Sequence, residues 1–499
     1  MRASFLPLSA LALLGLCIPQ GMSAATLLVD SIPALQSAIN VAVAGDTLTL
    51  KNGVYSTSQA ITVNRAGAAG QPITIAAESI GGVEITGTHG FSVTGAAAYV
   101  VIAGFKFTHA SGSNRINEGA SQVRFTRNTF LCSGDGAYLT VSADDTQIDY
   151  NEFGEKKSAG SMLAVSGAGS QVARRLWIHH NHFHDLASSG GDGAQMIRLG
   201  LMSAHSQSIG GCVVEHNLFS GCRGVSEMVS NRASGNIYRY NTLLDSPTSQ
   251  LTLRQGDDCS VYGNYFRNTE GVRIYGDRHR IFSNYFEGNT IAVAIGNGAP
   301  AADDGTPNKN DRPDDCVIAF NTFIDNRAPF SMSRRTPEAL GATNTTFANN
   351  LIQGGGTAVK IAGPYTGASW SGNLIWITTK IGDIPPEGYT HADPLLAAGP
   401  DGIQRPQPGS PVIGTASASF PGAEFDFDGQ PRPEKRSIGA DEPSMAPIAA
   451  RLLSSTDVGP NAPETKLTAV ADAASVGPAP TTAHVENQPT AGSSVKAAD

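Results

Sequence analysis

The feature that most constrains the fold is a short motif that recurs ten times: asparagine, any residue, then phenylalanine, leucine or isoleucine. Its asparagines are Asn128, Asn151, Asn181, Asn217, Asn241, Asn264, Asn284, Asn321, Asn350 and Asn373. They are 20 to 37 residues apart, with the shorter intervals clustering near 23. Short alternating segments such as 147–150 and 271–275 lie between them. A unit of this size cannot bury an apolar face alone, so successive units must stack.

Stacking of short strands at about 4.8 Å per coil predicts an all-β, right-handed parallel β-helix, or solenoid. The asparagine suits a fixed turn, because it tolerates a left-handed backbone and its amide can bond to the same amide one coil away. The composition also favours a β-structure: charged residues are only 15% of the chain, whereas helical bundles need many charged residues on their solvent-exposed faces. A hydrophobic fraction of 40% is enough for a core.

The two ends of the chain differ from this repeat. Residues 1–25 have the positive start, apolar stretch and small-residue cleavage site of a signal peptide, which predicts a secreted or periplasmic protein. The β-helix domain is expected over 26–443. Residues 444–499 contain no aromatic residue and are rich in Ala, Pro, Ser and Thr, so we expect a disordered tail.

Charge and cysteine content narrow the possible partners. The net charge of -9 argues against a nucleic-acid partner, and no later segment is apolar for long enough to span a membrane. Five cysteines remain after residue 25, an odd number that favours buried free thiols, although Cys212 and Cys222 are close enough in sequence to pair. We expect a monomer.

Arginine is concentrated in the central coils. Between Arg198 and Arg280 there are nine arginines, no lysine and seven acidic residues, in a chain that is acidic overall. Arg198, Arg232, Arg254 and Arg273 occupy comparable places in successive units, so stacking should align them along one groove. Guanidinium groups bind carboxylates in a bidentate manner, which favours an anionic partner.

Four segments of this region, 193–200, 226–233, 251–256 and 271–279, resemble polysaccharide lyase family 6, the alginate lyase and chondroitinase B family. The resemblance covers roughly residues 25–442. It implies a parallel β-helix that cleaves uronate polysaccharides by β-elimination, and alginate is the commoner substrate of the family. Such a reaction needs a neutralised carboxylate, a base for the C5 proton and an acid for the leaving oxygen.

The resemblance also implies roles for single residues. Arg254 matches the catalytic arginine, usually assigned as the acid, and is followed by Gln255 where the family usually has histidine. Arg232 stands where the family has its lysine base. Arginine is a poor base unless strongly desolvated, so three alternatives stay open: Arg232 is the base, another group such as a histidine or tyrosine is, or the site is weakened. Arg198, Gln255, Arg273 and His279 are the expected substrate contacts.

The calcium site that the resemblance implies is altered here. The family's Asn and two Glu ligands match Asp192, Val225 and Glu227, and a valine cannot bind a metal. We therefore favour a site without a cofactor, in which Glu227 positions an arginine, and keep Ca²⁺ held by Asp192 and Glu227 as the alternative. The run His179, His180, His182 and His184 lacks further ligand spacing for zinc, so turn and surface roles are favoured.

The leading hypothesis is thus a secreted lyase of the poly(mannuronate) or alginate lyase type. One alternative is a mannuronan C5-epimerase, although the expected Asp-Pro-His-Asp motif is absent from the sequence. Another is a β-helix that binds acidic glycans without catalysis.

Overall fold

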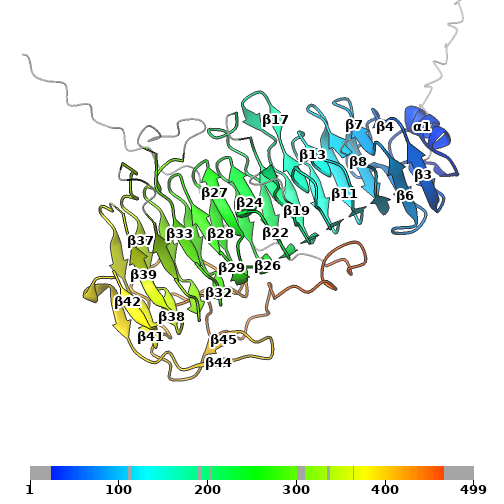
Figure 1. Cartoon of the computed structure of the whole chain (residues 1–499). Helices are drawn as coiled ribbons and strands as arrows, with labels where there is room; N and C mark the ends of the chain where they lie inside the picture. Colours follow the sequence, from blue (N-terminus) through cyan, green and yellow to red (C-terminus); the bar gives the residue numbers. More distant parts are fainter. Residues whose placement is uncertain are drawn as a thin grey trace, which may run out of the picture.

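A computed structural model describes residues 24–110, 114–188, 193–201, 204–299, 310–333, 336, 338–363 and 365–465. Within them the chain winds through three long parallel sheets, so that each coil contributes one strand to each sheet (Figure 1). The predicted parallel β-helix is therefore confirmed. The first 23 residues of the predicted signal peptide, the predicted ligand Asp192 and residues 466–499 of the predicted tail lie outside the described residues.

Sheet 1 has 14 strands: β1 (Thr26–Val29), β2 (Thr47–Leu50), β5 (Ile73–Ala77), β8 (Ala98–Ala103), β11 (Ser121–Thr126), β14 (Gln147–Asp149), β19 (Trp177–His179), β22 (Val213–Glu215), β25 (Ile237–Arg239), β28 (Ser260–Tyr262), β31 (Arg280–Phe282), β34 (Val317–Ala319), β37 (Thr346–Ala348) and β40 (Ser369–Ser371).

Sheet 2 has 13 strands: β4 (Ile61–Val63), β7 (Phe91–Val93), β10 (Asn114–Ile116), β13 (Leu139–Val141), β16 (Leu163–Val165), β21 (Ile197–Leu199), β24 (Glu227–Arg232), β27 (Gln250–Gln255), β30 (Val272–Ile274), β33 (Val293–Ile295), β36 (Phe330–Met332), β39 (Thr357–Ile361) and β42 (Lys380–Gly382).

Sheet 3 has 14 strands: β3 (Gly53–Thr57), β6 (Val83–Gly87), β9 (Phe105–Phe107), β12 (Thr129–Phe130), β15 (Glu152–Phe153), β20 (His182–His184), β23 (Leu218–Ser220), β26 (Thr242–Ser246), β29 (Tyr265–Thr269), β32 (Tyr285–Glu287), β35 (Thr322–Ile324), β38 (Leu351–Gln353), β41 (Asn373–Trp376) and β43 (Tyr389–His391). The remaining elements are the helix α1 (Ile32–Val41), the antiparallel pairs β17 (Gly167–Ala168) with β18 (Gln171–Val172) and β44 (Leu396–Ala398) with β45 (Gln404–Pro406), and a 3-10 helix at Pro386–Gly388.

The repeated motif forms the corner between sheets 1 and 3. Each asparagine side chain donates to the side-chain oxygen of the asparagine in the next coil, as from Asn241 to Asn264 at 2.9 Å, and this ladder runs unbroken from Asn128 to Asn373. The predicted ladder is confirmed, but the predicted backbone is wrong in one respect. The residue before each asparagine, such as Tyr240 at φ 54°, takes the left-handed conformation instead of the asparagine.

Helix α1 covers the first end of the solenoid and was not predicted. Its N-cap is Ser31, whose side chain accepts the N–H of Ala34, and a proline lies in its first turn. Leu35 and Ile39 are fully buried against the core. Only these capping residues mark the helix in the sequence. The helix covers the apolar interior that the first coil would otherwise expose to water.

The C-terminal segment returns along the corner that the asparagine ladder forms (Figure 1). Residues between Ala450 and Ala462 of the predicted disordered tail are packed there, so that part of the prediction is wrong. Leu453 and Val458 are buried against Leu218, and Arg127 donates to the carbonyl of Pro460 at 2.7 Å. Few large apolar residues are needed to order this segment, because its small residues and backbone groups pack against the corner of the already folded solenoid.

The five cysteines after residue 25 are buried and free, as the odd number predicted. Among the described helices, none combines the length and apolar character that crossing a membrane requires.

Candidate active site

The four predicted arginines lie on four neighbouring strands of sheet 2. They belong to β21, β24, β27 and β30, which pair in that order. Strand register aligns Arg198, Ser230, Thr252 and Arg273 in one row, and these residues alternate with buried neighbours that are apolar except for Asn231. The arginines therefore share the outer face of one sheet, as predicted. At about 4.8 Å per strand, the backbones of Arg198 and Arg273 are about 14 Å apart.

Arg232 and Arg254 meet at one buried carboxylate. Glu227 Oε1 accepts from Arg254 Nη1 at 2.6 Å, and Glu227 Oε2 lies 4.0 Å from Arg232 Nη2. The Glu227 side chain is 3% exposed, whereas those of Arg232 and Arg254 are 13% and 24% exposed. Two guanidinium groups and one carboxylate leave a surplus positive charge that faces outward. We call this group the Glu227 triad.

An irregularity in the strands places the triad. Asn231 pairs with Leu253 but Arg232 pairs with Gln255, so Arg254 is an extra residue on its strand. A bulge of this kind redirects a side chain, and here it brings Arg254 beside Arg232 in the neighbouring coil. Arg232 is fixed further by Ser230, whose Oγ accepts from its Nε at 3.1 Å. Sequence reasoning missed Ser230, although its spacing of two residues from Arg232 puts both on one face of a strand.

Two arginines of this face have unused hydrogen-bonding capacity. Among the described residues, nothing accepts from the buried Nε atoms of Arg198 and Arg254. Burial lowers the pKa of Arg198, and no carboxylate of the described residues offsets this effect. An anionic group bound here would supply both the missing acceptor and the missing counter-charge.

The remaining predicted substrate contacts are buried. Gln255 is 4% exposed, next to Arg254 on the sheet. The prediction for His279 is wrong, because its side chain has no exposed surface and is used within the fold. Its Nδ1 accepts from the N–H of Cys259 at 3.1 Å, and its Nε2 donates to the carbonyl of Tyr275 at 2.8 Å. His279 thus joins neighbouring turns and cannot reach a ligand.

Of the predicted calcium positions, the two that the structure describes, Val225 and Glu227, do not fit a calcium ion. Val225 is apolar and buried, and Glu227 is the one described member of the set that offers oxygen ligands. Both its oxygens face guanidinium groups, which would repel a cation. Glu227 instead bonds Arg254 and lies near Arg232, and the expectation that the protein works without calcium stays a prediction.

The histidine run lies on other faces of the solenoid. His179 and His180 belong to the ladder corner, where burial lowers the pKa of His180 to about 4. His182 and His184 face outward on β20 of sheet 3, where His184 contacts Glu152 at 3.1 Å. The described histidines therefore take the predicted turn and surface roles.

One group of carboxylates with metal-like spacing occurs among the described residues, in the turns that follow sheet 2. Oxygen atoms of Asp257, Asp277 and Asp311 lie within 4.8 Å of one another. Arg278 lies 3.2 Å from Asp257 and 3.6 Å from Asp277, and so offsets part of their charge. Burial, followed by repulsion from Asp257 and Asp311, raises the pKa of Asp277 to about 8.

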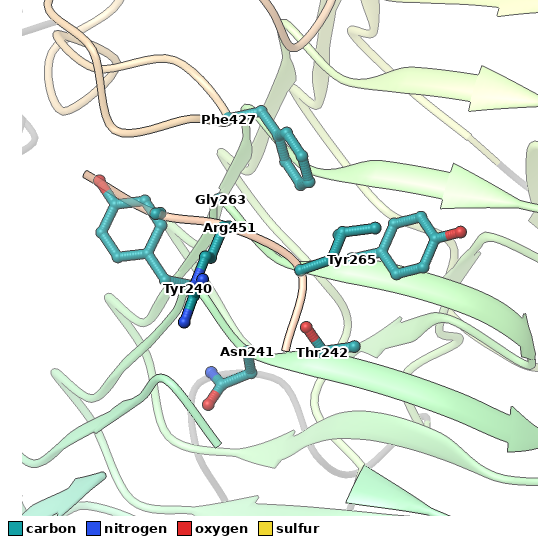
Figure 2. A pocket seen from close by; sticks show the side chains of 9 residues that line it. Tyr240, Asn241, Thr242, Gly263, Tyr265, Phe427 and Arg451 are labelled. Atoms are coloured by element: carbon teal, nitrogen blue, oxygen red, sulfur yellow. The ribbon is translucent and has the colours of Figure 1, made fainter. Parts of the chain in front are cut away.

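A small crevice lies between the coils and the returning C-terminal segment, lined by Tyr240, Tyr265, Phe427 and Leu452 among others (Figure 2). It belongs to the ladder corner and contains none of the arginines of sheet 2. The arginine-lined face of sheet 2 is therefore the better candidate for a functional site.

The fold and this face together define a class: a parallel β-helix protein with an arginine-lined site for an anionic ligand. The sequence model of the chondroitinase B family matches residues 29–337, which is more than half of the chain. The chain belongs to this family, polysaccharide lyase family 6, as the resemblance indicated. The comparison with curated proteins gives no match.

Solved structures of the family share the fold. The chain matches the PL6 family alginate lyase AlyGC with a TM-score of 0.71 and 21% identity, covering 88% of this chain and 59% of AlyGC. A mannuronic acid specific polysaccharide family 6 lyase from human gut microbiota matches with a TM-score of 0.64 and 22% identity over 74% of this chain and 91% of that one. The PL6 family polysaccharide lyase Pedsa3628 from Pseudopedobacter saltans has a TM-score of 0.55 and 15% identity, covering 87% of this chain and 99% of that one. The chain thus spans about three fifths of the length of AlyGC, and at these identities the likeness concerns the fold.

Proposed function

We propose that the protein is a polysaccharide lyase that cleaves a uronate polymer, with alginate as the first candidate, by β-elimination. The observation that carries the proposal is the Glu227 triad, which presents a surplus positive charge beside the unsatisfied Nε of Arg254 on the outer face of sheet 2. Membership of the chondroitinase B family and the fold of the alginate lyases support it.

In the proposed reaction, the arginines of the outer face of sheet 2 that stay protonated neutralise the uronate carboxylate, so that the C5 proton becomes acidic. A base removes this proton, the electron pair forms the C4–C5 double bond, and the C4–O4 bond breaks. Arg254 donates the proton that the departing O4 needs. Its contact with Glu227 orients the guanidinium, and Arg198 and Arg273 hold neighbouring sugar units.

We propose Arg232 as the base, because it occupies the place of the family's lysine and its side chain is largely shielded from water. Tyr275 is the alternative. It follows Ile274, the register partner of Leu253, so it lies one coil beyond Arg254. Its side chain is only 2% exposed and packs against Gly296, so it can take the proton only if ligand binding uncovers it. Arg232→Lys should retain or raise activity if Arg232 is the base, whereas Tyr275→Phe should abolish turnover if Tyr275 is.

The test is a panel of polymers: alginate, its mannuronate-rich and guluronate-rich fractions, and dermatan sulfate. A lyase produces an unsaturated uronate, seen as a rise in ultraviolet absorbance, and Arg254→Ala should abolish this rise while the variant melts like the parent. No rise but an altered ratio of the two uronates would instead identify the epimerase. Retention on the polymer with neither change would identify a binding protein.

We propose further that the reaction needs no calcium, because the protonated arginines of the outer face of sheet 2 supply the positive charge. A chelator should leave the rate unchanged, and a loss of activity that added Ca²⁺ restores would contradict this. We also propose that the protein acts as a monomer, secreted or periplasmic, after removal of residues 1–25.

A further inference from the structure

The row of sheet 2 that contains Arg198 and Arg273 extends far beyond the candidate active site. Strand pairing places one outward-facing residue per coil in this row, which we call the axial row: Thr62, Ser92, Arg115, Thr140, Ala164, Arg198, Ser230, Thr252, Arg273, Ala294, Ser331 and Lys360. Every residue of the axial row is described, and none of them is acidic.

The cations of the axial row are evenly spaced. Arg115, Arg198, Arg273 and Lys360 are each three strands from the next, so neighbouring cations are about 14 Å apart and the outer two about 43 Å apart. Only Ala, Ser and Thr lie between them. The result is a straight line of positive charges separated by small neutral residues, along the axis of an acidic protein.

The two outer cations are available to a ligand. Arg115 and Lys360 are exposed, and no ion pair between described residues involves either of them. Some arginines on other faces are paired, as Arg124 is with Asp149 and Arg175 with Asp145 at 2.6 Å. The uncompensated charge of the outer face of sheet 2 therefore follows the axial row.

We propose that the axial row is an extended track for a linear polyanionic polysaccharide, in which Arg115 and Lys360 bind sugar units far from the cleavage point. That the sugars are uronates rests on the proposed function. A pyranose unit is about as long as one strand step, so a chain lying along the axis meets a cation about every third sugar. Long chains can contact all four cations, whereas short oligomers cannot reach the outer two.

The test compares chain lengths with Arg115→Ala, Lys360→Ala and the double variant. For long alginate, the double variant should show a KM raised about fivefold or more, a weaker dependence on ionic strength and the parent kcat. For a tetrasaccharide, its KM should equal that of the parent. Arg267→Ala on β29 of sheet 3 and Lys51→Ala, two exposed cations away from sheet 2, serve as controls that should not change the polymer KM.

A polymer KM equal to that of the parent, or one raised equally for the tetrasaccharide, would overturn the track. Retardation of the Arg254→Ala protein during electrophoresis through alginate gels tests it separately from catalysis. Loss of this retardation when Arg115 and Lys360 are also replaced supports the track, even if no polymer in the panel is cleaved and the proposed function fails. Unchanged retardation, or none in the starting protein, overturns it.

Discussion

Glu227 determines how the guanidinium groups of the site are held. Removing a carboxylate from water is unfavourable unless charged hydrogen bonds replace its hydration, and here Arg254 supplies such a bond at 2.6 Å while Arg232 lies at 4.0 Å. Under the proposed function, this pairing fixes the guanidinium of Arg232 where the family has its lysine. A lysine has a single charged nitrogen, whereas the guanidinium of Arg232 can bond Ser230 through one nitrogen and face Glu227 with another.

Glu227→Gln should therefore damage both stability and catalysis. It leaves two guanidinium groups beside each other without their counter-charge, and since both are partly exposed we expect a loss of about 1–3 kcal/mol in unfolding free energy. Arg254 also loses its orientation, so kcat should fall at least about tenfold. Denaturant melts and steady-state kinetics measure the two effects.

Glu270→Gln is the matched control, since Glu270 is a half-buried acid close to Arg273 but outside the triad. Its effect on kcat should be much smaller. Equal losses from the two substitutions would show that the triad has no special part in catalysis.

At the residue scale, the sequence predicted the alignment of the arginines but not the contacts of single side chains in the site. The alignment of the arginines follows from the repeat, because stacked coils bring equivalent positions together. The bulge at Arg254 has no marker in the sequence, so its pairing with Glu227 was not foreseen. The prediction for His279 was wrong for a similar reason. A histidine next to a strand end can line a groove or be buried in a turn, and the sequence does not show that the backbones of Cys259 and Tyr275 bond its ring.

At the scale of the elements, the corner turn is specified by the asparagine side chain. Asn264 accepts from the backbone and side chain of Asn241 and donates to two carbonyls and to Asn284, all without exposure to water. The left-handed residue before the asparagine was not predictable, because Arg, Tyr, His, Phe, Ser, Gly and Asn all occupy that place. The ladder bonds, and not local preference, impose its conformation.

Asn264→Ala should consequently lower the free energy of unfolding by at least about 2 kcal/mol, since it leaves several buried donors and acceptors unsatisfied. Asn40→Ala is a suitable control, because Asn40 is an exposed residue of α1 whose side chain bonds only Gln36 among the described residues. That variant should remain within about 0.5 kcal/mol of the parent. Similar losses from both substitutions would mean that the ladder contributes little.

The acidic turns after sheet 2 predict a dependence on pH. The pKa of Asp277 is raised to about 8 in the folded protein, first by burial and then by Asp257, Asp311 and Asp314, so the folded state holds a proton that the unfolded state releases near pH 4. The stability that Asp277 contributes is therefore lost as the pH rises through the folded pKa of about 8.

Asp277→Asn removes this titration and keeps an oxygen that can accept the N–H of Asp314. The parent should lose stability relative to this variant as the pH rises from 5 to 8, as measured by thermal melts at each pH. A constant difference in Tm over this range would show that Asp277 does not titrate there.

At the scale of the whole molecule, the solenoid separates two tasks. The arginines of the candidate active site lie on sheet 2, whereas the asparagine ladder and the returning C-terminal segment lie at the corner between sheets 1 and 3. The repeat predicted the solenoid because every coil repeats the same buried pattern. It could not predict the packing of residues 450–462, since a segment outside the repeat has no periodic signal, and its contacts depend on a surface formed by distant coils.

Truncation after Pro443 should test this separation. It removes Leu453 and Val458, whose burial contributes about 3–6 kcal/mol to stability if the entropy lost on ordering the segment is not subtracted. It also removes the hydrogen bonds from Arg127 to the carbonyls of Pro460 and Ala462. The Tm should fall, while kcat at low temperature should stay at the parent value because the segment contacts the ladder corner and not sheet 2. Truncation after Thr465, which keeps all of these contacts, should preserve the parent Tm. If the shorter protein instead lost kcat while melting like the parent, the C-terminal segment would have to act on the site itself, and the division of tasks between the faces of the solenoid would be wrong.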